Sequence, residues 1–278
     1  MNILISADST CDLNPGLLST YHIALTPLYV IFGDEAKKDG AECSAADILA
    51  YTERTGQLCS TSAVSIADYA DFFAEMCGQY DAVIHFTISS ELSSCYRNAC
   101  AAAGEYPNRV FVVDSLSVSS GTGIQAIRAA EDRDRGLDAE EIYRRALSRR
   151  EKVYVFFVSD SLDYLRKGGR CSAVAALGAN MLKIKPCIET VNGKLEMGKK
   201  YRGTLGRVLK EMIRDCLQKY DVRRDMVFVT HNVRDYGALS GVLEELKDFE
   251  RIEICPVGAT VVSHCGGNTL GIIVECRK

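Results

Sequence analysis

Four serines are expected to lie where a buried strand is followed by a helix. The apolar run 80–85 predicts the strand and the alanine-rich run 97–103 predicts the helix, and between them stand Ser89, Ser90, Ser93 and Ser94. In an open α/β sheet, ligands bind at the carboxyl ends of the strands, and the first turn of a helix offers free N–H groups that favour an anion. The spacing therefore indicates a site for a small anionic group, with helix capping as the alternative role of these hydroxyls.

A second hydroxyl-rich stretch, residues 59–65 (Cys-Ser-Thr-Ser-Ala-Val-Ser), stands directly before an expected helix over 66–77. The two stretches could converge on the same anion, because hydroxyls add short hydrogen bonds that need no counter-charge. Capping explains either stretch alone. Together they hold more hydroxyls than two caps need, so a binding role stays open.

The sequence gives little support for a catalytic site of a known hydrolase type or for a metal site. The serine-hydrolase motif G-x-S-x-G is absent, and no spacing supports His85 or His231, the two candidates for a catalytic base. The four histidines, His22, His85, His231 and His264, lie far apart in the sequence. The 12 cysteines include no C-x-x-C pair, which argues against a metal site and favours free, mostly buried thiols. A cysteine nucleophile stays open, because the sequence does not distinguish among so many thiols.

The composition narrows the class of protein further. The chain has 278 residues, 47% of them hydrophobic and 25% charged, with a formal net charge of -4. That balance supports a sizeable core and argues against a nucleic-acid groove or a polybasic membrane surface. The first residues lack the basic start and apolar core of a signal peptide, and no apolar run is long enough to span a membrane. We therefore expect a cytoplasmic protein with reduced thiols and no stable membrane insertion.

The first half of the chain repeats the order strand, polar turn, helix. Apolar runs predict strands over 2–7, 23–32 (broken by Pro27), 80–85 and 110–113, and residues 33–40 are expected to form a polar turn or a hairpin tip. Helices are expected over 14–21, from 44, and over 66–77, 97–103, 124–130 and 138–150. This recurrence predicts a mostly parallel sheet. Gly121 and Gly123 do not fit a nucleotide-binding loop and are expected to let a helix pack closely on the sheet.

The second half mixes hairpins with helices, so its sheet is expected to be mixed or antiparallel. Strands are predicted over 153–158, 184–191, 194–197, 226–230, 251–255, 260–263 and 266–275, with a hairpin turn at Asn192-Gly193. Helices are predicted over 162–170, 173–182, 204–219 and 238–246. We place a boundary near residue 155, which gives two α/β domains, residues 1–155 and 156–278, with a broad interface.

Several separated motifs together resemble the DegV family of bacterial fatty-acid-binding proteins. In the first half they are Asp8-Ser-Thr-Cys-Asp-Leu13, Thr61-Ser-Ala-Val-Ser65, Ser89-Ser-Glu-Leu-Ser-Ser-Cys-Tyr96, and Val113-Asp-Ser115 with Ser120-Gly-Thr-Gly123. In the second half they are Leu162-Asp-Tyr-Leu-Arg-Lys-Gly-Gly-Arg170, Ile184-Lys-Pro186, Tyr201-Arg-Gly203 and Ser263-His-Cys-Gly-Gly-Asn-Thr-Leu-Gly271. Each motif is weak alone, and the set is specific because all of them occur in this order.

The resemblance implies two α/β domains with a long-chain fatty acid held in a tunnel between them. Its carboxylate would lie against the side chains of Thr61 and Ser93. The backbone N–H groups of Ser62 and Ser94 would lie nearby, and His264 would help to complete the head-group site. This implication agrees with the anion site expected from the two hydroxyl-rich stretches.

The resemblance also implies that an arginine lies at the head group or at a docking surface, and that the protein works with a partner enzyme. The arginine would be Arg170 or Arg202, placed at the head group or where a partner docks. The partner would be a fatty acid kinase that uses its own ATP and magnesium to phosphorylate the bound carboxylate. The basic run Arg166-Lys-Gly-Gly-Arg170 would be a docking surface for it. This chain would then be a carrier with no cofactor and no catalytic residue of its own.

Three segments depart from the motifs that the family usually shows. Ala63-Val64 stands where the family usually has Gln-Pro, Ser94-Cys95 where it has Gly-Thr, and Gly267-Asn268 where it has Pro-Gly. These substitutions flank the expected head-group site, so we expect them to bear on ligand or partner preference.

A function from another class stays open beside the carrier. The alternative is an enzyme that acts on a small phosphate or carboxylate through the loops 89–94 and 121–123. An apolar cavity would favour the carrier, and a shallow polar cleft with a reactive thiol would favour the enzyme. Asp8 and Asp114 each end an expected strand, and both are expected to be turn or cap residues.

Overall fold

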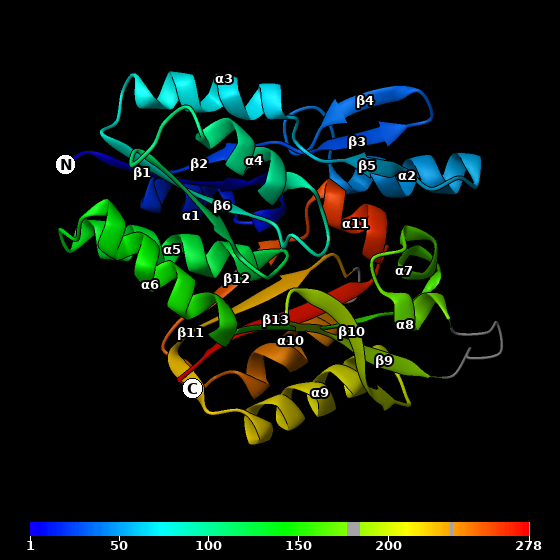
Figure 1. Ribbon diagram of the computed structural model, residues 1–278. Helices are drawn as coiled ribbons and strands as arrows, with labels where there is room; N and C mark the ends of the chain where they lie inside the picture. The colour runs from blue at the N-terminus through cyan, green and yellow to red at the C-terminus, as the bar shows by residue number, and fades with distance from the viewer. Residues whose placement is uncertain (177–183, 234–235, 278) are drawn as a thin grey trace.

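The computed structural model describes residues 1–176, 184–233 and 236–277, which form two large sheets with helices between and around them (Figure 1). The first sheet is parallel, with strand order β2-β1-β6-β7: β1 (Ile3–Asp8), β2 (Ile23–Thr26), β6 (Ala82–Thr87) and β7 (Val110–Asp114). Every residue of β1 and β6 is buried, as expected for strands covered on both faces. The parallel sheet predicted for the first half is confirmed.

Helices cover both faces of this first sheet. On one face lie α3 (Ile66–Cys77) and α4 (Cys95–Ala103), and on the other lie α1 (Pro15–Tyr21), α5 (Ser120–Asp134) and α6 (Ala139–Arg149) (Figure 1). Short 3-10 helices follow β1 and α6, at Ser9–Cys11 and Arg150–Lys152. Helices α1 and α6 begin at local sequence signals, because Asn14 caps α1 ahead of Pro15 and Asp138 caps α6.

A small antiparallel sheet lies beside the first one, in the order β4-β3-β5: β3 (Tyr29–Phe32), β4 (Glu35–Lys38) and β5 (Ser60–Ser62). Helix α2 (Ala45–Thr55) starts at a capping box formed by Ser44 and Asp47. Residues 33–40 were expected to form a polar turn or a hairpin tip, and the structure has the hairpin, in which β4 pairs with the adjacent strand β3. The hydroxyl-rich stretch that was expected to lead into α3 differs from the prediction at its start, because Ser60–Ser62 form a strand paired with β3. That pairing partner lies elsewhere in the sequence, so local sequence does not reveal it.

The second large sheet is mixed, with strand order β10-β9-β8-β13-β11-β12. Its strands are β8 (Val153–Ser159), β9 (Lys185–Val191), β10 (Lys194–Tyr201), β11 (Val222–His231), β12 (Ile252–Pro256) and β13 (Thr269–Cys276). Only the β11–β12 pair is parallel among the pairs of this described sheet. Asn192 and Gly193 turn the β9–β10 hairpin with positive φ angles of 49° and 80°, as predicted.

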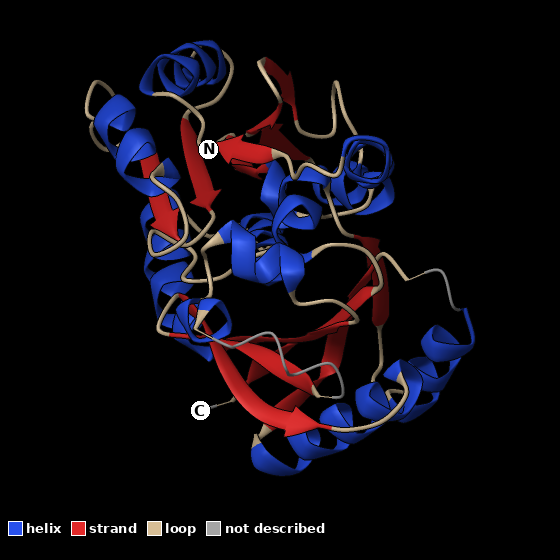
Figure 2. Ribbon diagram, turned by 90° about the vertical axis from the view of Figure 1, so that its right-hand side faces the viewer, coloured by secondary structure: helices blue, strands red, loops and turns tan. Residues whose placement is uncertain are grey.

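The two faces of the second sheet bury different partners. Helices α9 (Leu205–Lys219) and α10 (Tyr236–Glu245) cover one face, and the other face points toward the first sheet (Figures 1 and 2). Side chains alternate accordingly along β8, since Phe156 packs with the α9–α10 layer and Phe157 packs in the core shared with the first half.

Three short helices contact one another in a row between the small sheet and β10: α11 (Ala259–Cys265), α7 (Asp163–Gly168) and α8 (Ser172–Ala175). The strand predicted over 260–263 is therefore wrong, because these residues form the middle of α11. The helix predicted over 173–182 is described only as α8, and residues 177–183 lie outside the described residues. Among the described residues, no helix combines the length and apolarity that a membrane span requires.

Contacts between the two halves are extensive, although the division into domains at residue 155 stays a prediction. Two carboxylates of the first half reach the start of α11, where Asp12 accepts from the Gly258 N–H and Asp39 from the Ala259 N–H, each at 3.0 Å. Gly121 and Gly123 allow α5 to pack closely, as expected. A Cβ on Gly121 would stand 2.6 Å from Val155 of β8, and one on Gly123 would stand 2.8 Å from the Cys11 carbonyl.

Candidate functional site

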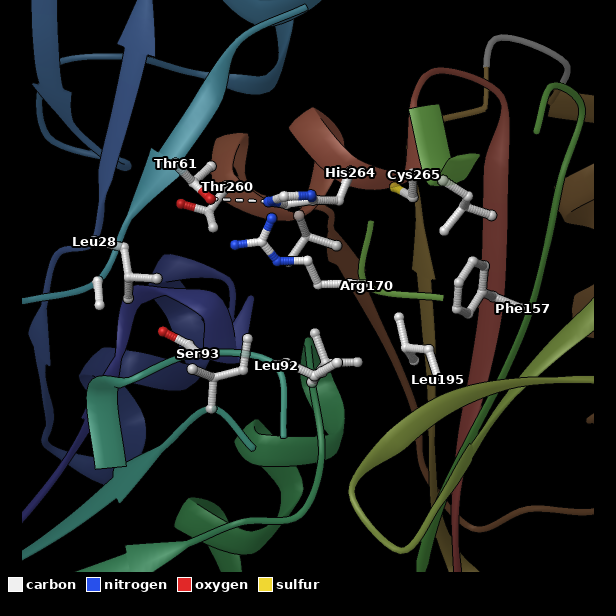
Figure 3. Close-up of a pocket in the computed structure, with 15 residues that line it drawn as sticks. Leu28, Thr61, Leu92, Ser93, Phe157, Arg170, Leu195, Thr260, His264 and Cys265 are labelled. Carbon is white, nitrogen blue, oxygen red and sulfur yellow. Dashed lines mark hydrogen bonds between the residues drawn. The ribbon is translucent and has the colours of Figure 1, made fainter. Parts of the chain in front are cut away.

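A pocket of about 640 Å³, part of it open to solvent, lies between the two halves of the molecule. The first half contributes β5 and the loops that follow β2 and β6, and the second half contributes α7, α11 and the strands β8 and β10 (Figure 3). Its polar lining residues are Thr61, Ser93, Arg170, Thr260 and His264. Its apolar lining residues are Leu28, Ala63, Ile88, Leu92, Val118, Phe157, Leu165, Leu195, Val261 and Cys265. Four of the residues expected at a head group therefore line one pocket.

The polar residues gather at one end of this pocket. Thr61 Oγ1 and His264 Nε2 lie 2.9 Å apart, and the Arg170 guanidinium lies between them and Ser93 (Figure 3). Thr260 also belongs to this end, and its hydroxyl is buried with no hydrogen-bond partner among the described residues. We call Thr61, Ser93, Arg170, Thr260 and His264 the polar end.

His264 is neutral near pH 7. Burial, with a smaller contribution from the positive charge of Arg170, lowers the pKa of His264 to about 4. Its ring stands against the C-terminal turn of α7, where a Cβ on Gly168 would come within 2.7 Å of Nδ1. Glycine at position 168 is thus required for the imidazole to reach Thr61, and Gly169 then ends the helix with φ at 70°.

Arg170 supplies the only charge of the described lining. One of its nitrogens donates to the Gly168 carbonyl at 2.9 Å, and no described carboxylate forms an ion pair with it. Acidic side chains are missing from the described pocket wall. An anion at the polar end would therefore meet a positive charge and several hydroxyls, with no like charge opposing it.

Only one of the four serines that follow β6 lines the pocket. Ser93 Oγ accepts from the Cys95 N–H at 3.3 Å and donates to Cys95 Sγ at 3.2 Å. Ser89 instead donates to the Gly193 carbonyl at 2.7 Å, and Ser90 donates through its backbone N–H to Asp114 at 3.1 Å. Ser94 precedes α4 without a capping bond from its side chain.

Two other predicted residues lie outside the described pocket wall. Ser62 is exposed, and its hydroxyl donates to the Ala63 carbonyl at 3.4 Å. Arg202 is exposed just after β10. The side chains of Ser62, Ser94 and Arg202 are thus not brought to the polar end, and contributions from the backbone of Ser62 and Ser94 stay a prediction. Thr260 was missed because its segment was expected to be a strand.

A second apolar pocket of about 360 Å³ adjoins the first one. The two share Val118, Phe157, Val261 and Cys265 as walls. The second pocket extends toward the sheet at Gly271, where a Cβ would stand only 2.9 Å from Phe157 Cβ. The space available beyond the polar end is therefore apolar and reaches into the core between the halves.

The remaining candidate chemistry has structural roles. Asp114 accepts from the backbone N–H groups of Ser90 and Leu116, as expected of a turn residue. Asp8 is wholly buried and accepts from side chains as well as from the Ile88 N–H, so it is more than a cap. Gly121 and Gly123 lie inside buried α5, so the loop that the enzyme alternative needed there does not exist.

Thiols and metal ligands add no reactive centre to the described residues. All 12 cysteines are free, and all except Cys100 are buried, as predicted. Burial raises the pKa of the pocket thiol Cys265 to about 12, which leaves it protonated and a poor nucleophile. No cluster of potential metal ligands is found among the described side chains.

Comparisons with known proteins match the chain over its full length. The profile of a family described as uncharacterised, the DegV family, matches residues 2–277. A DegV domain-containing protein of Deinococcus radiodurans is 31% identical over 282 residues, which cover 99% of each chain. A protein of Thermotoga maritima described as a fatty acid-binding protein is 29% identical over 287 residues, covering 99% of this chain and 98% of its own.

A solved structure shares the whole fold. It is a DegV family protein from Thermus thermophilus, described by its fatty acid binding, and it superposes with a TM-score of 0.92 at 26% identity. The match covers 99% of this chain and 100% of the other. The α/β architecture expected from the sequence is thereby confirmed, with its parallel and mixed sheets.

Proposed function

Because the chain belongs to the DegV family, we propose that it binds a long-chain fatty acid in the pocket between its two halves. The observation that carries this proposal is the polarity of the pocket. One end holds hydroxyls and an arginine without a carboxylate partner among the described residues, and the rest of the wall is apolar. The relatives from Thermotoga maritima and Thermus thermophilus, which are described as binding fatty acids, support it.

In this proposal the polar end holds the carboxylate. Arg170 supplies the charge, and the hydroxyls of Thr61 and Ser93 donate hydrogen bonds to the carboxylate oxygens. His264 is neutral and assists through Thr61. When the proton of the imidazole is on Nε2, that nitrogen donates to Thr61 Oγ1 and leaves the Thr61 proton for the ligand. The buried Thr260 hydroxyl, which has no described partner, gains one from the same carboxylate.

The acyl chain would follow the apolar wall away from the polar end. It would pass between Phe157 and Val261, which both pockets share, and continue into the second pocket. Each buried methylene contributes about 0.8 kcal/mol, so burial of the tail supplies most of the affinity. The carboxylate contacts then fix which end of the ligand lies near solvent.

We further propose that the chain presents this carboxylate to a partner fatty acid kinase in the cytoplasm. Arg170 is exposed although it lines the pocket, so the head group would lie close to the surface. Arg166, also exposed and four residues earlier on α7, would extend the contact to the partner. Catalysis would then belong to the kinase, and this chain would act as a binding protein.

Native mass spectrometry of the purified protein, followed by denaturing extraction, tests the binding proposal. We expect a co-purified mass that matches a long-chain fatty acid. The double variant Thr61→Ala/Ser93→Ala should lose it, and the control Ser62→Ala/Ser90→Ala, which removes two exposed hydroxyls, should keep it. A protein that is empty, and stays empty when offered oleate or palmitate, would overturn the proposal.

The kinase step needs its own test. The palmitate-loaded protein is mixed with a bacterial fatty acid kinase, ATP and magnesium, and acyl phosphate is trapped with hydroxylamine. We expect trapped product from the loaded wild-type chain and less from the variant Arg166→Glu. Absence of product from a loaded wild-type chain would reject the presentation step and leave the binding proposal standing.

A further inference from the structure

A chain of buried side chains leads inward from the pocket serine. We call Ser93, Cys95, Tyr69, Asp8 and His85 the buried polar chain. Ser93 Oγ donates to Cys95 Sγ at 3.2 Å, the Cys95 and Tyr69 side chains are neighbours, and the Tyr69 hydroxyl donates to Asp8 Oδ1 at 2.5 Å. All members except Ser93 are fully buried, and none of these four lines the pocket. Direct contact with a ligand therefore does not explain them.

Asp8 anchors the inner end of this chain. Its carboxylate accepts from the Ile88 N–H at 2.9 Å and from the Thr26 hydroxyl at 3.1 Å, besides Tyr69. His85 Nε2 lies 3.2 Å from the same carboxylate. A buried carboxylate with this many donors is a strong acceptor, so the Tyr69 proton is directed to it.

The Ser93 and Tyr69 protons both point inward as a result. Because the Tyr69 proton is directed to Asp8, it is not available to the Cys95 sulfur. Burial raises the pKa of Cys95 to about 12, so the thiol keeps its proton. The Cys95 sulfur then accepts from Ser93, as the geometry shows. Sulfur is a weak acceptor, so this outermost bond is the weakest of the series.

We propose that Cys95 is a positioning residue that holds the Ser93 hydroxyl proton loosely, so that Ser93 gives it to an anionic head group in preference to a neutral one. This inference rests on the proposed function. A carboxylate is a far stronger acceptor than sulfur, so turning the proton outward is favourable when an acid binds. An alcohol head group offers a weaker acceptor, and the gain is correspondingly smaller. The buried polar chain thus makes the protein prefer a fatty acid to a neutral amphiphile that has a tail of the same length.

The variant Cys95→Ser tests this role, because oxygen is a better acceptor than sulfur and holds the Ser93 proton more firmly. The probes are myristate and tetradecan-1-ol, which share a tail and differ in the head group. We expect the preference for myristate over tetradecan-1-ol to fall by about three-fold, the size of one modest neutral hydrogen bond. The control Cys77→Ser alters another buried cysteine at the far end of α3 and should leave the preference unchanged.

A second variant guards against a folding defect in the first. Cys95→Ala removes the inward acceptor altogether, so the preference for myristate should rise instead of falling. The infrared carboxylate band of bound [1-13C]myristate gives an independent readout. In Cys95→Ser it should shift toward its position in Ser93→Ala, and in Cys77→Ser it should match the wild type.

The possible results distinguish a failure of this inference from a failure of the proposed fatty-acid binding. If the wild type binds no myristate, the proposed function itself fails. If the wild type binds myristate, and Cys95→Ser and Cys95→Ala weaken both probes equally without moving the infrared band, Cys95 only packs and the inference is overturned. Opposite changes of preference in the two variants would support it.

Discussion

His264 Nε2 and Thr61 Oγ1 lie 2.9 Å apart, although 203 residues separate them in the chain. This contact joins the last turn of α11 to the short strand β5, so the polar end exists only when both halves are folded and docked. The imidazole is neutral and therefore adds no charge of its own. Its effect on a ligand depends on how it orients the Thr61 hydroxyl.

Thr61→Val keeps the shape of this side chain and removes its hydroxyl. We expect the affinity for palmitate to fall about ten-fold or more, because a hydrogen bond to a charged group contributes roughly 1.5–3 kcal/mol. Isothermal titration calorimetry of the delipidated protein with palmitate measures this affinity. The neighbouring variant Ser62→Ala removes an exposed hydroxyl that does not line the pocket and should leave the affinity unchanged. Equal losses in both variants would contradict the assignment of Thr61.

Arg170 and Arg202 are both exposed arginines, but only Arg170 lines the pocket. We expect Arg170→Gln to weaken palmitate binding about ten-fold, since it removes the one charge of the described pocket wall. The loss should shrink at high salt, because screening already weakens the wild-type attraction. Arg202→Gln is the matched control and should bind palmitate as the wild type does. An affinity that responds to Arg202 and not to Arg170 would place the head group elsewhere.

The depressed pKa of His264 predicts a loss of stability in mild acid. Between pH 6.5 and about 4 the unfolded chain takes up a proton on this residue while the folded chain does not. Stability is therefore fully retained above pH 6.5, and this group alone lowers it by up to about 1.4 kcal/mol per pH unit as the pH falls. Urea denaturation at pH 7.5, 6.5 and 5.5 measures the slope. His264→Gln should have the shallower slope, and equal slopes would refute the assignment.

Most strands and helix starts are predictable because their causes are local. The apolar runs of β1 and β6 are buried on both faces, and Ser44 and Ser65 begin α2 and α3 with capping boxes that the sequence displays. Helix α11 is different. Its β-branched residues favour a strand, but Asp12 and Asp39 accept from the first two N–H groups at its start. Those acceptors come from the far end of the chain, so no local pattern reveals the helix.

The site was predictable where a residue of a recognised motif also lines the pocket with its side chain. Thr61, Ser93, Arg170 and His264 line the pocket as the resemblance implied. The expected convergence of two helix starts was wrong in one respect, because Thr61 lies on β5 and its hydroxyl is brought to the pocket by pairing with β3. Tertiary packing decides which of several neighbouring hydroxyls faces inward, and motif spacing alone does not.

Gly168 is expected to be essential for placing the imidazole. A Cβ there would stand 2.7 Å from His264 Nδ1, closer than any real contact, so Gly168→Ala must displace either the ring or α7. We expect weaker palmitate binding together with destabilisation of about 1–3 kcal/mol. Gly267→Ala is the control, because its Cβ would meet only Leu49 at an ordinary 3.5 Å. Thermal unfolding and titration of both variants decide the matter, and wild-type binding by Gly168→Ala would contradict it.

Val118 is expected to control the length of chain that the protein accepts. It belongs to the wall that both pockets share, so Val118→Phe should close the passage to the second pocket. The variant should bind palmitate much more weakly and decanoate nearly as well as before. Each methylene kept out of the core forfeits about 0.8 kcal/mol, or roughly four-fold in affinity. The conservative variant Val118→Ile is the control and should bind palmitate as the wild type does. A uniform loss across both acids would show that Val118→Phe disturbs packing and that the tail does not enter the second pocket.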